Sequence, residues 1–464
     1  ITLGALVLTS FLGTWDGAAP VVALPAITRE FGVGIDAAVW VLTIGSLLFA
    51  VPMAIFGKLG DMVGHRRIYL WAIGAYAVLA LGSGLAPTFG WLIFFRALQG
   101  IGSSPAFTAT MALIATLFPR EERGRAMGLM GMAASIAWAT GPLAGGMLMR
   151  WFSWRAIMFA EVPVALAAFV LAWRLMPQDA HHNRQKFDVL GAGALTGAVL
   201  TMMFALRMVG IWGWAGAPTI AAGVTALGLL VLFIVTERRA SEPFVPLELF
   251  ANIRYSIATL FSIVQMATLF GSMLLMPLFL QEVKGYDAAR AGLLIAGLSL
   301  ARIVFDPLAG RVAEVRGSRL PSLVGSYLIA ATALFIAVTL SASMSDWIIV
   351  LAMILLGIGI SLGRTPVNTA VTHVIDAERL GLALGVFSML TFTGGSLGQA
   401  FFGVLLRELS GAGNAPLASA QPSMLLTAFG VAFGIVAVVA LIASLFGLRL
   451  PTREMMSGPI AAHS

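Results

Sequence analysis

Long apolar segments alternate with short polar ones along the whole chain. We count fourteen apolar segments, most of them 20 residues or longer, which is the length an α-helix needs to cross the hydrocarbon core of a bilayer. They cover residues 1–26, 38–59, 68–87, 90–117, 125–149, 154–175, 188–209, 216–236, 254–281, 288–313, 320–341, 346–371, 380–407 and 422–448. The alternating ten-residue segments of a membrane β-barrel are absent. The pattern therefore predicts an all-α polytopic membrane protein.

Composition and charge agree with this class. Of the 464 residues, 59% are hydrophobic and 11% are charged, whereas a soluble domain carries about 25% charged residues. The net charge of +7 does not indicate nucleic acid as a partner, because the cations lie in short loops between the apolar segments. By alternate loops, 18 Lys and Arg fall on one side and 7 on the other, with three inside segments. The excess marks the cytoplasmic side, so we expect both chain ends in the cytoplasm.

A short polar motif occurs twice. Gly57-Lys-Leu-Gly-Asp-Met-Val-Gly-His-Arg-Arg67 follows the second segment, and Gly310-Arg-Val-Ala-Glu-Val-Arg-Gly-Ser-Arg319 follows the tenth. Such a repeat is typical of an internally duplicated transporter. It predicts an N-terminal six-helix half (1–177), two inserted helices with their linkers (178–253), a C-terminal six-helix half (254–450) and a cytoplasmic tail (451–464).

The first copy, Gly57–Arg67, resembles the signature loop of the major facilitator superfamily, which reads roughly G-x-L-a-D-r-x-G-r-k. The resemblance implies the major facilitator fold with fourteen transmembrane helices arranged as six, two and six. It also implies that Asp61 braces the cytoplasmic ends of the two halves, near a helix N-terminus or an Arg of its own loop. The predicted gating residues are Gly57, Asp61, Gly64, Arg66, Arg67, Gly310, Glu314 and Gly317.

An acid lies inside the first apolar segment. Asp16 costs about 2.5–3.5 kcal/mol there on insertion scales, so it requires a partner or a water-filled cavity. The stretch Trp15–Pro25 resembles the D-x-T-I-V-N-V-A-L-P motif of fourteen-span drug–proton antiporters. Its Thr and Asn positions are Ala18 and Val21, which favours a more apolar substrate. The alternative is a structural carboxylate paired with a nearby Arg.

Further charges lie inside other segments. Arg96 and Gln99 form an R-x-x-Q-G pattern, which resembles a superfamily motif linked to proton transfer. Glu161 stands at the Asn position of W-R-x-x-F-x-x-N-x-P and adds a second intramembrane acid. In the second half, Asp306 lies four residues after Arg302, so the two can pair on one helix face. The predicted proton-coupling residues are Asp16, Glu161, Arg96 and Asp306. Each also has a structural interpretation, as an ion pair, a packing cation or a hydrogen-bonded neutral acid; Arg364 is a further cation without an assigned role.

The fifth segment contains Gly141-Pro142-Leu-Ala-Gly145-Gly146, which resembles the G-P-x-x-G-G motif of exporters in the superfamily. Proline kinks a helix and glycine permits close packing, so an ordinary kinked helix is the alternative. We also predict a substrate cavity lined by Trp15, Trp40, Gln99, Trp138 and Phe392. Most aromatic residues of membrane helices simply pack or face lipid.

Together these features predict a proton-coupled antiporter of the cytoplasmic membrane that exports hydrophobic or amphipathic small molecules, cationic ones included, as a monomer. The alternatives are an exporter of a lipid or metabolite, or a proton symporter of the same superfamily. The sequence holds no cysteine and no H-E-x-x-H or P-loop pattern. We therefore expect no enzymatic activity, no metal and no cofactor, with the proton gradient as the driving force.

Overall fold

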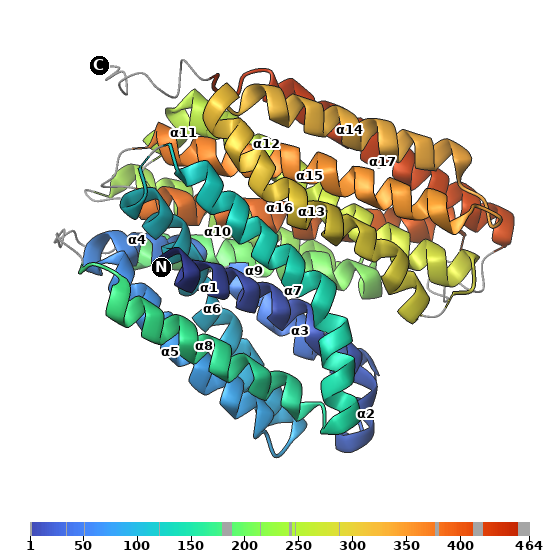
Figure 1. Ribbon diagram of the computed structural model, residues 1–464, viewed down its shortest axis with the longest axis horizontal. Helices are drawn as coiled ribbons and strands as arrows, with labels where there is room; N and C mark the ends of the chain where they lie inside the picture. Colours follow the sequence, from blue (N-terminus) through green and yellow to red (C-terminus); the bar gives the residue numbers. More distant parts are fainter. Residues whose placement is uncertain are drawn as a thin grey trace. The chain divides into compact units, whose positions relative to one another are not determined.

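The computed structural model (Figure 1) describes residues 2–33, 35–50, 52–119, 121–178, 188–213, 215–240, 244–245, 247–286, 288–375, 380–411 and 421–452. Within these ranges the chain is helical, and its one β-type contact is an isolated bridge between Gly317 and Thr452. The chain divides into two compact units. Unit 1 comprises residues 1–188 and 375–389, and unit 2 comprises residues 189–374 and 390–464.

The helices of unit 1 are α1 (Thr2–Ala18), the 3₁₀ turn η1 (Ala19–Ala23), α2 (Leu24–Phe31), α3 (Ile35–Ala50), α4 (Met53–Val63), α5 (His65–Gly84), α6 (Phe89–Leu117), α7 (Arg123–Trp151) and α8 (Arg155–Leu175). Those of unit 2 are α9 (Val189–Trp212), α10 (Ala217–Arg239), α11 (Glu248–Ala251), α12 (Ile253–Leu278), the π-helical turn η2 (Phe279–Val283), α13 (Ala288–Arg316), α14 (Arg319–Thr339), α15 (Asp346–Val374) and α17 (Pro422–Gly447). Helix α16 (Leu380–Leu409) begins with residues grouped in unit 1 and continues in unit 2.

Twelve helical stretches of the described chain are long and apolar enough to cross a membrane. The residues Trp40–Ala50 and Met53–Val63 would add a thirteenth as one span bent by 47°. A shorter apolar stretch, Val189–Ala205, lies in α9. The predicted all-α membrane class is confirmed, and each of the fourteen apolar segments contains a helix.

Helices α9 and α10, the predicted inserted pair, pack along each other within unit 2. Within the predicted inserted region 178–253, residues 179–187, 241–243 and 246 lie outside the described residues, as does most of the predicted tail 451–464.

Local signals explain several helix ends. The Thr88 hydroxyl accepts a hydrogen bond from Trp91 N at the start of α6, and the Asn252 side chain accepts from Arg254 N and Tyr255 N at the start of α12. Gly32 ends α2 with a φ of 63°, a left-handed conformation that suits glycine.

At the start of α8, Trp154 Nε1 and Arg155 donate to the two carboxylate oxygens of Glu30, at 2.6 and 2.5 Å, and so fasten α2 to α8.

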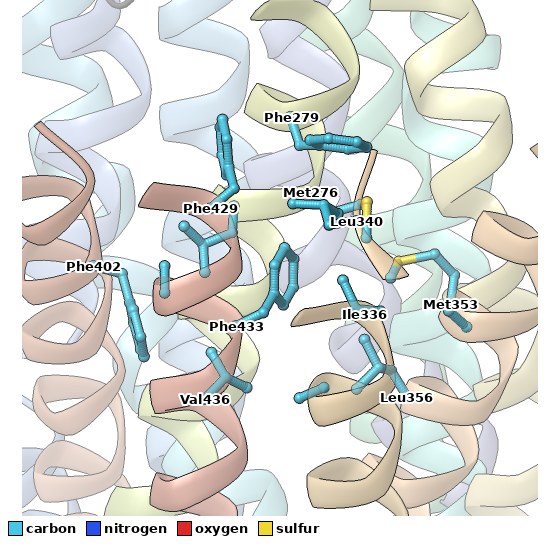
Figure 2. Packing of buried hydrophobic residues seen from close by; sticks show 14 of the residues in the cluster. Met276, Phe279, Ile336, Leu340, Met353, Leu356, Phe402, Phe429, Phe433 and Val436 are labelled. Carbon is cyan, nitrogen blue, oxygen red and sulfur yellow. The ribbon is translucent and has the colours of Figure 1, made fainter. Parts of the chain in front are cut away.

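Unit 2 has an aromatic core, shown in Figure 2. Phe279 and Phe429 meet edge to face, with ring centroids 5.7 Å apart. Met276, Met353 and Phe433 are buried beside them, together with side chains from α12, α14, α15, α16 and α17. Since lipid is as apolar as this core, close packing rather than burial from water holds the helices together.

Glycine provides that close packing between α14 and α15. A Cβ atom added at Gly325 would lie 2.5 Å from Gly359 O and 2.6 Å from Gly363 N, both of which are backbone atoms that cannot swing away. We predict that Gly325→Ala destabilises the purified protein by about 1–3 kcal/mol, the usual range for overpacking. The measurement is thermal unfolding in detergent, with Gly434→Ala as the control because a Cβ there meets nothing within 4 Å. Equal melting temperatures for the two variants would contradict the packing assignment.

Candidate functional site

A buried network of charged and polar side chains occupies the middle of unit 1. Arg96 on α6 donates from Nη1 to Asp16 Oδ1 on α1, in an ion pair, and from Nε to Val41 O on α3 at 3.0 Å. Its Nη2 also donates to the backbone carbonyl of Asp16 at 3.3 Å. Arg96 is 1% exposed, and the side chain of Asp16 is 14% exposed. The guanidinium therefore has its counter-ion and ties three helices together.

Gln99 bridges the two acids of the network. Its amide oxygen accepts from Arg96 Nη1 and from Ser83 Oγ, each at 3.2 Å. Its amide nitrogen donates to Asp16 Oδ1 at 3.1 Å and to Glu161 Oε2 at 2.6 Å. All four hydrogen-bonding positions of the amide are used, so the side chain is held in one orientation. The sequence placed Gln99 on the wall of a substrate cavity; the structure places it, fully buried, inside the charge network.

Glu161 on α8 is 1% exposed and is bound on one side only. Its Oε2 accepts from Gln99 and from the hydroxyl of Tyr76 at 2.9 Å. Its Oε1 is buried and has no hydrogen-bond partner among the described residues. No cation contacts this carboxyl group in the described part of the chain, so the network holds two acids and one directly paired base.

The backbone beside the network contains a helix break that packs against glycines of α7. Two residues after Asp16, helix α1 ends at Ala18 and the 3₁₀ turn η1, which contains Pro20, begins. Gly141 and Gly145 of α7 face this turn: a Cβ at Gly141 would meet Ala18 Cβ at 3.0 Å, and one at Gly145 would meet Ala19 O at 3.0 Å. Two glycines of the predicted antiporter motif thus seat the break beside Asp16. Pro142 is exposed and Gly146 faces open space.

The glycine of the R-x-x-Q-G pattern has its own role. A Cβ at Gly100 would fall on the backbone of Gly45, with Gly45 Cα 2.9 Å away. Gly45 in turn lies against the Arg96 guanidinium, since a Cβ there would be 3.6 Å from Nη2. Helices α3 and α6 therefore approach backbone to backbone beside the buried charge.

The loop Gly57–Arg67, predicted to act in gating, caps a helix far away in the sequence. Asp61 Oδ1 accepts from Gly381 N at 2.9 Å and Oδ2 accepts from Leu382 N at 2.7 Å, in the first turn of α16. His65 Nε2 lies 3.1 Å from Oδ1. A Cβ at Gly57 would fall on the backbone of Gly381, so only glycine lets the two segments approach. The expected helix N-terminus near Asp61 is thus the start of α16.

The other loop residues have local roles. Gly64 separates α4 from α5 with a φ of 108°, and Gly317 ends α13 with a φ of 78° before α14 begins, so the two copies of the motif share a glycine turn. Arg66 donates to Trp173 O at 2.7 Å, and Arg67 is exposed. Gly310 is buried within α13, and Glu314 lies on the same helix, half-buried.

The aromatic residues assigned to a cavity are placed separately. Trp15 is buried, stacks on Phe11 at 5.6 Å, and has an Nε1 without a partner among the described residues. Trp138 is 38% exposed and reaches Gly17, and Trp40 is half-buried. In unit 2, Phe392 packs against the aromatic core. Asp306 also lies in unit 2, where its Oδ2 accepts from Arg302 Nη2 at 3.2 Å.

Sequence reasoning missed two members of the network, Tyr76 and Ser83. Both lie on α5, seven residues apart, and Tyr69 lies seven residues earlier, where its hydroxyl donates to Ala5 O at 3.0 Å. Seven residues are about two helical turns, so the three hydroxyl groups lie along one face. This spacing was the available signal.

Comparison with known proteins identifies the class. The model of the Major Facilitator Superfamily matches residues 6–188, 189–399 and 258–460, and the chain belongs to this family of membrane transporters. It is therefore a multi-pass membrane transporter of small molecules and not an enzyme.

Relatives and solved structures agree. The multidrug resistance protein Stp of Mycobacterium tuberculosis (strain CDC 1551 / Oshkosh) is 31% identical over 407 residues, covering 88% of this chain and 75% of the relative. The tetracenomycin C resistance and export protein of Streptomyces glaucescens is 31% identical over 416 residues, covering 88% and 76%. The proton:xylose symporter XylE shares the fold with a TM-score of 0.70 at 14% identity, covering 98% of each chain.

The cap on α16 carries a prediction. In Asp61→Asn, only one oxygen remains to accept from the two N–H groups, and the negative charge at the helix N-terminus is lost. We expect a stability loss of about 0.5–2 kcal/mol, the usual range for a lost cap, and a larger relative fall in transport rate than in expression. The rate is measured per reconstituted protein, beside Glu122→Gln, which removes an acid that makes no cap hydrogen bond at the start of α7. Wild-type transport by Asp61→Asn would show that the cap has no gating role.

Proposed function

We propose that this transporter is a proton-coupled antiporter that exports hydrophobic or amphipathic small molecules, cationic ones included, by alternating access. It would act in the cytoplasmic membrane as a monomer with both chain ends in the cytoplasm, and the proton gradient would be its only driving force. Drug export is supported by the relatives, one named a multidrug resistance protein and one a resistance and export protein.

The proposal includes fourteen spans arranged as six, two and six. In its support, α3 and α4 together form a bent span, and α9 is an apolar helix of 24 residues packed along the span α10. Helices α9 and α10 would then be the inserted pair.

The observation that carries proton coupling is the excess of acid in the network, which holds two acids and one cation. Arg96 pairs with Asp16, while Glu161 is fully buried, contacts no cation and leaves Oε1 without a partner among the described residues. A buried carboxylate without a counter-ion is strongly disfavoured, and the group binds a proton instead. We therefore assign the proton to Glu161 in this conformation, while Asp16 forms the ion pair with Arg96.

Alternating access would make this proton mobile. When the cavity opens to one side and water reaches Glu161, the carboxylate becomes hydrated and the proton can leave. Asp16 keeps Arg96 neutralised throughout, so only one charge changes in the cycle. Each proton that enters down a membrane potential of 100 mV supplies about 2.3 kcal/mol, before the pH gradient is counted. Protonation from outside would displace the exported molecule, and release inside would reset the site.

The two acids give different predictions. Gln at position 161 has the shape of the protonated acid and can still accept from Gln99 and Tyr76. We expect Glu161→Gln to remain folded and to keep substrate counterflow, while its transport driven by a pH gradient falls to the level of empty proteoliposomes.

Asp16→Asn leaves the Arg96 guanidinium without its counter-ion, so we expect it to lose about 3–5 kcal/mol of stability.

The assay measures transport into proteoliposomes. Two fluorescent dyes that share a ring system are tried, anionic fluorescein and cationic rhodamine 123, and the variants are measured with the dye that the wild type transports. Thermal unfolding of each variant provides the control for folding. Full gradient-driven transport by both variants would place the coupling carboxylate elsewhere, and Asp306 would be tested next.

A further inference from the structure

A second group of charges lies within unit 2, and the proposed proton coupling does not use it. Its Arg302 and Asp306 are buried, and its Arg364 is half-buried. Arg302 and Asp306 come from α13, and Arg364 comes from α15, which packs along α13 (Figure 1). Both helices meet the criteria for membrane spans. The group contains two cations and one acid.

The packing of α13 and α15 brings these residues to the same level. A Cβ at Gly297 would lie 3.2 Å from Val350 O, and one at Gly357 would lie 2.5 Å from Leu298 O and 3.0 Å from Ala301 Cβ. The contact thus advances in the same direction along both helices, which run parallel. Within about two further turns, α13 carries Arg302 and Asp306, and α15 carries Ser361 and Arg364.

The hydrogen bonds of this group are incomplete. Arg302 donates to Asp306 from Nη2 at 3.2 Å, but its Nε is buried and has no partner among the described residues. Arg364 interacts electrostatically with both members of that pair, unfavourably with Arg302 and favourably with Asp306. In the described part of the chain it makes no hydrogen bond and no ion pair of its own. Ser361, one turn before Arg364, has a buried hydroxyl without a partner in the same ranges.

One charge in this group is therefore not compensated. Asp306 can neutralise one guanidinium, and the second is half-buried on a helix long and apolar enough to cross a membrane, where an unpaired charge is costly. Guanidinium groups are weakly hydrated and bind planar anions through two parallel hydrogen bonds. A ligand that brings one negative charge would neutralise the group and accept from the donors that lack partners.

We infer that Arg302, Arg364 and Ser361 form an anion-binding subsite of unit 2, which receives the carboxylate, sulfonate or phosphate group of an amphipathic substrate. Asp306 holds Arg302 in place and limits the excess to one positive charge. The inference rests on the proposed export function for its ligand, and it narrows the substrate class to molecules that carry an anionic group. It assigns Asp306 to substrate binding rather than to the proton.

The test measures equilibrium binding of fluorescein and rhodamine 123 to purified protein in detergent, by fluorescence anisotropy, without any proton gradient. Arg364→Gln should weaken fluorescein binding about tenfold and leave rhodamine 123 binding unchanged or tighter, because a charged hydrogen bond is lost only for the anion. Asp306→Asn should act in the opposite direction and tighten fluorescein binding. Arg316→Gln, which removes an exposed cation from the same helix, is the matched control.

A purely structural role for the cations predicts a different result. Both dyes would then lose affinity in parallel with the melting temperature of each variant, and Asp306→Asn would not strengthen binding of the anion. The subsite would be overturned by a parallel loss of affinity for both dyes, or by a failure of Asp306→Asn to strengthen fluorescein binding. Unchanged fluorescein binding in Arg364→Gln would also overturn it. Because no gradient is used, these outcomes are independent of Glu161: loss of coupling in Glu161→Gln with no effect at Arg364 rejects the subsite alone.

Discussion

The guanidinium of Arg96 is the group on which the rest of unit 1 depends. A cation buried among apolar helices must be neutralised and fully hydrogen-bonded, and Asp16, Val41 O and Gln99 accomplish this from α1, α3 and α6. The break between α1 and η1 follows two residues after Asp16, and it packs against Gly141 and Gly145 of α7. Once one acid is committed to Arg96, Glu161 has no counter-ion and becomes the group whose charge can change.

The two units contain charge groups of opposite excess, and in both the excess charge within apolar helices must be neutralised. In unit 1 the acids outnumber the buried base, and a proton can balance the difference. In unit 2 two arginines, Arg302 and Arg364, accompany one acid, and no proton can balance an excess of arginine because its guanidinium stays protonated. Compensation there requires an anion from outside the protein. The proposed antiport thus has a proton carrier in one unit and a substrate anchor in the other.

Much of this arrangement could be predicted from the sequence, because a charge within an apolar segment is costly and stands out. Asp16, Arg96 and Glu161 were found in this way, and the repeated loop pointed to Gly64 and Gly317, which the structure shows in positive-φ turns. Tyr76 and Ser83 were missed because a hydroxyl in a helix costs little and carries no such signal. The partner of Asp61 could not be predicted, since its two N–H donors lie more than 300 residues away and any backbone could supply them.

The central claim is that Glu161 is protonated while Asp16 is ionised, and infrared difference spectroscopy of the purified protein across a pH titration tests it most directly. A protonated carboxyl group absorbs apart from a carboxylate, and its band shifts with hydrogen bonding. The account predicts one buried protonated carboxyl in the wild type, whose band disappears in Glu161→Gln and persists in Asp16→Asn. A band that persists in Glu161→Gln and disappears in Asp16→Asn would contradict it, because the proton would then lie on the acid paired with Arg96.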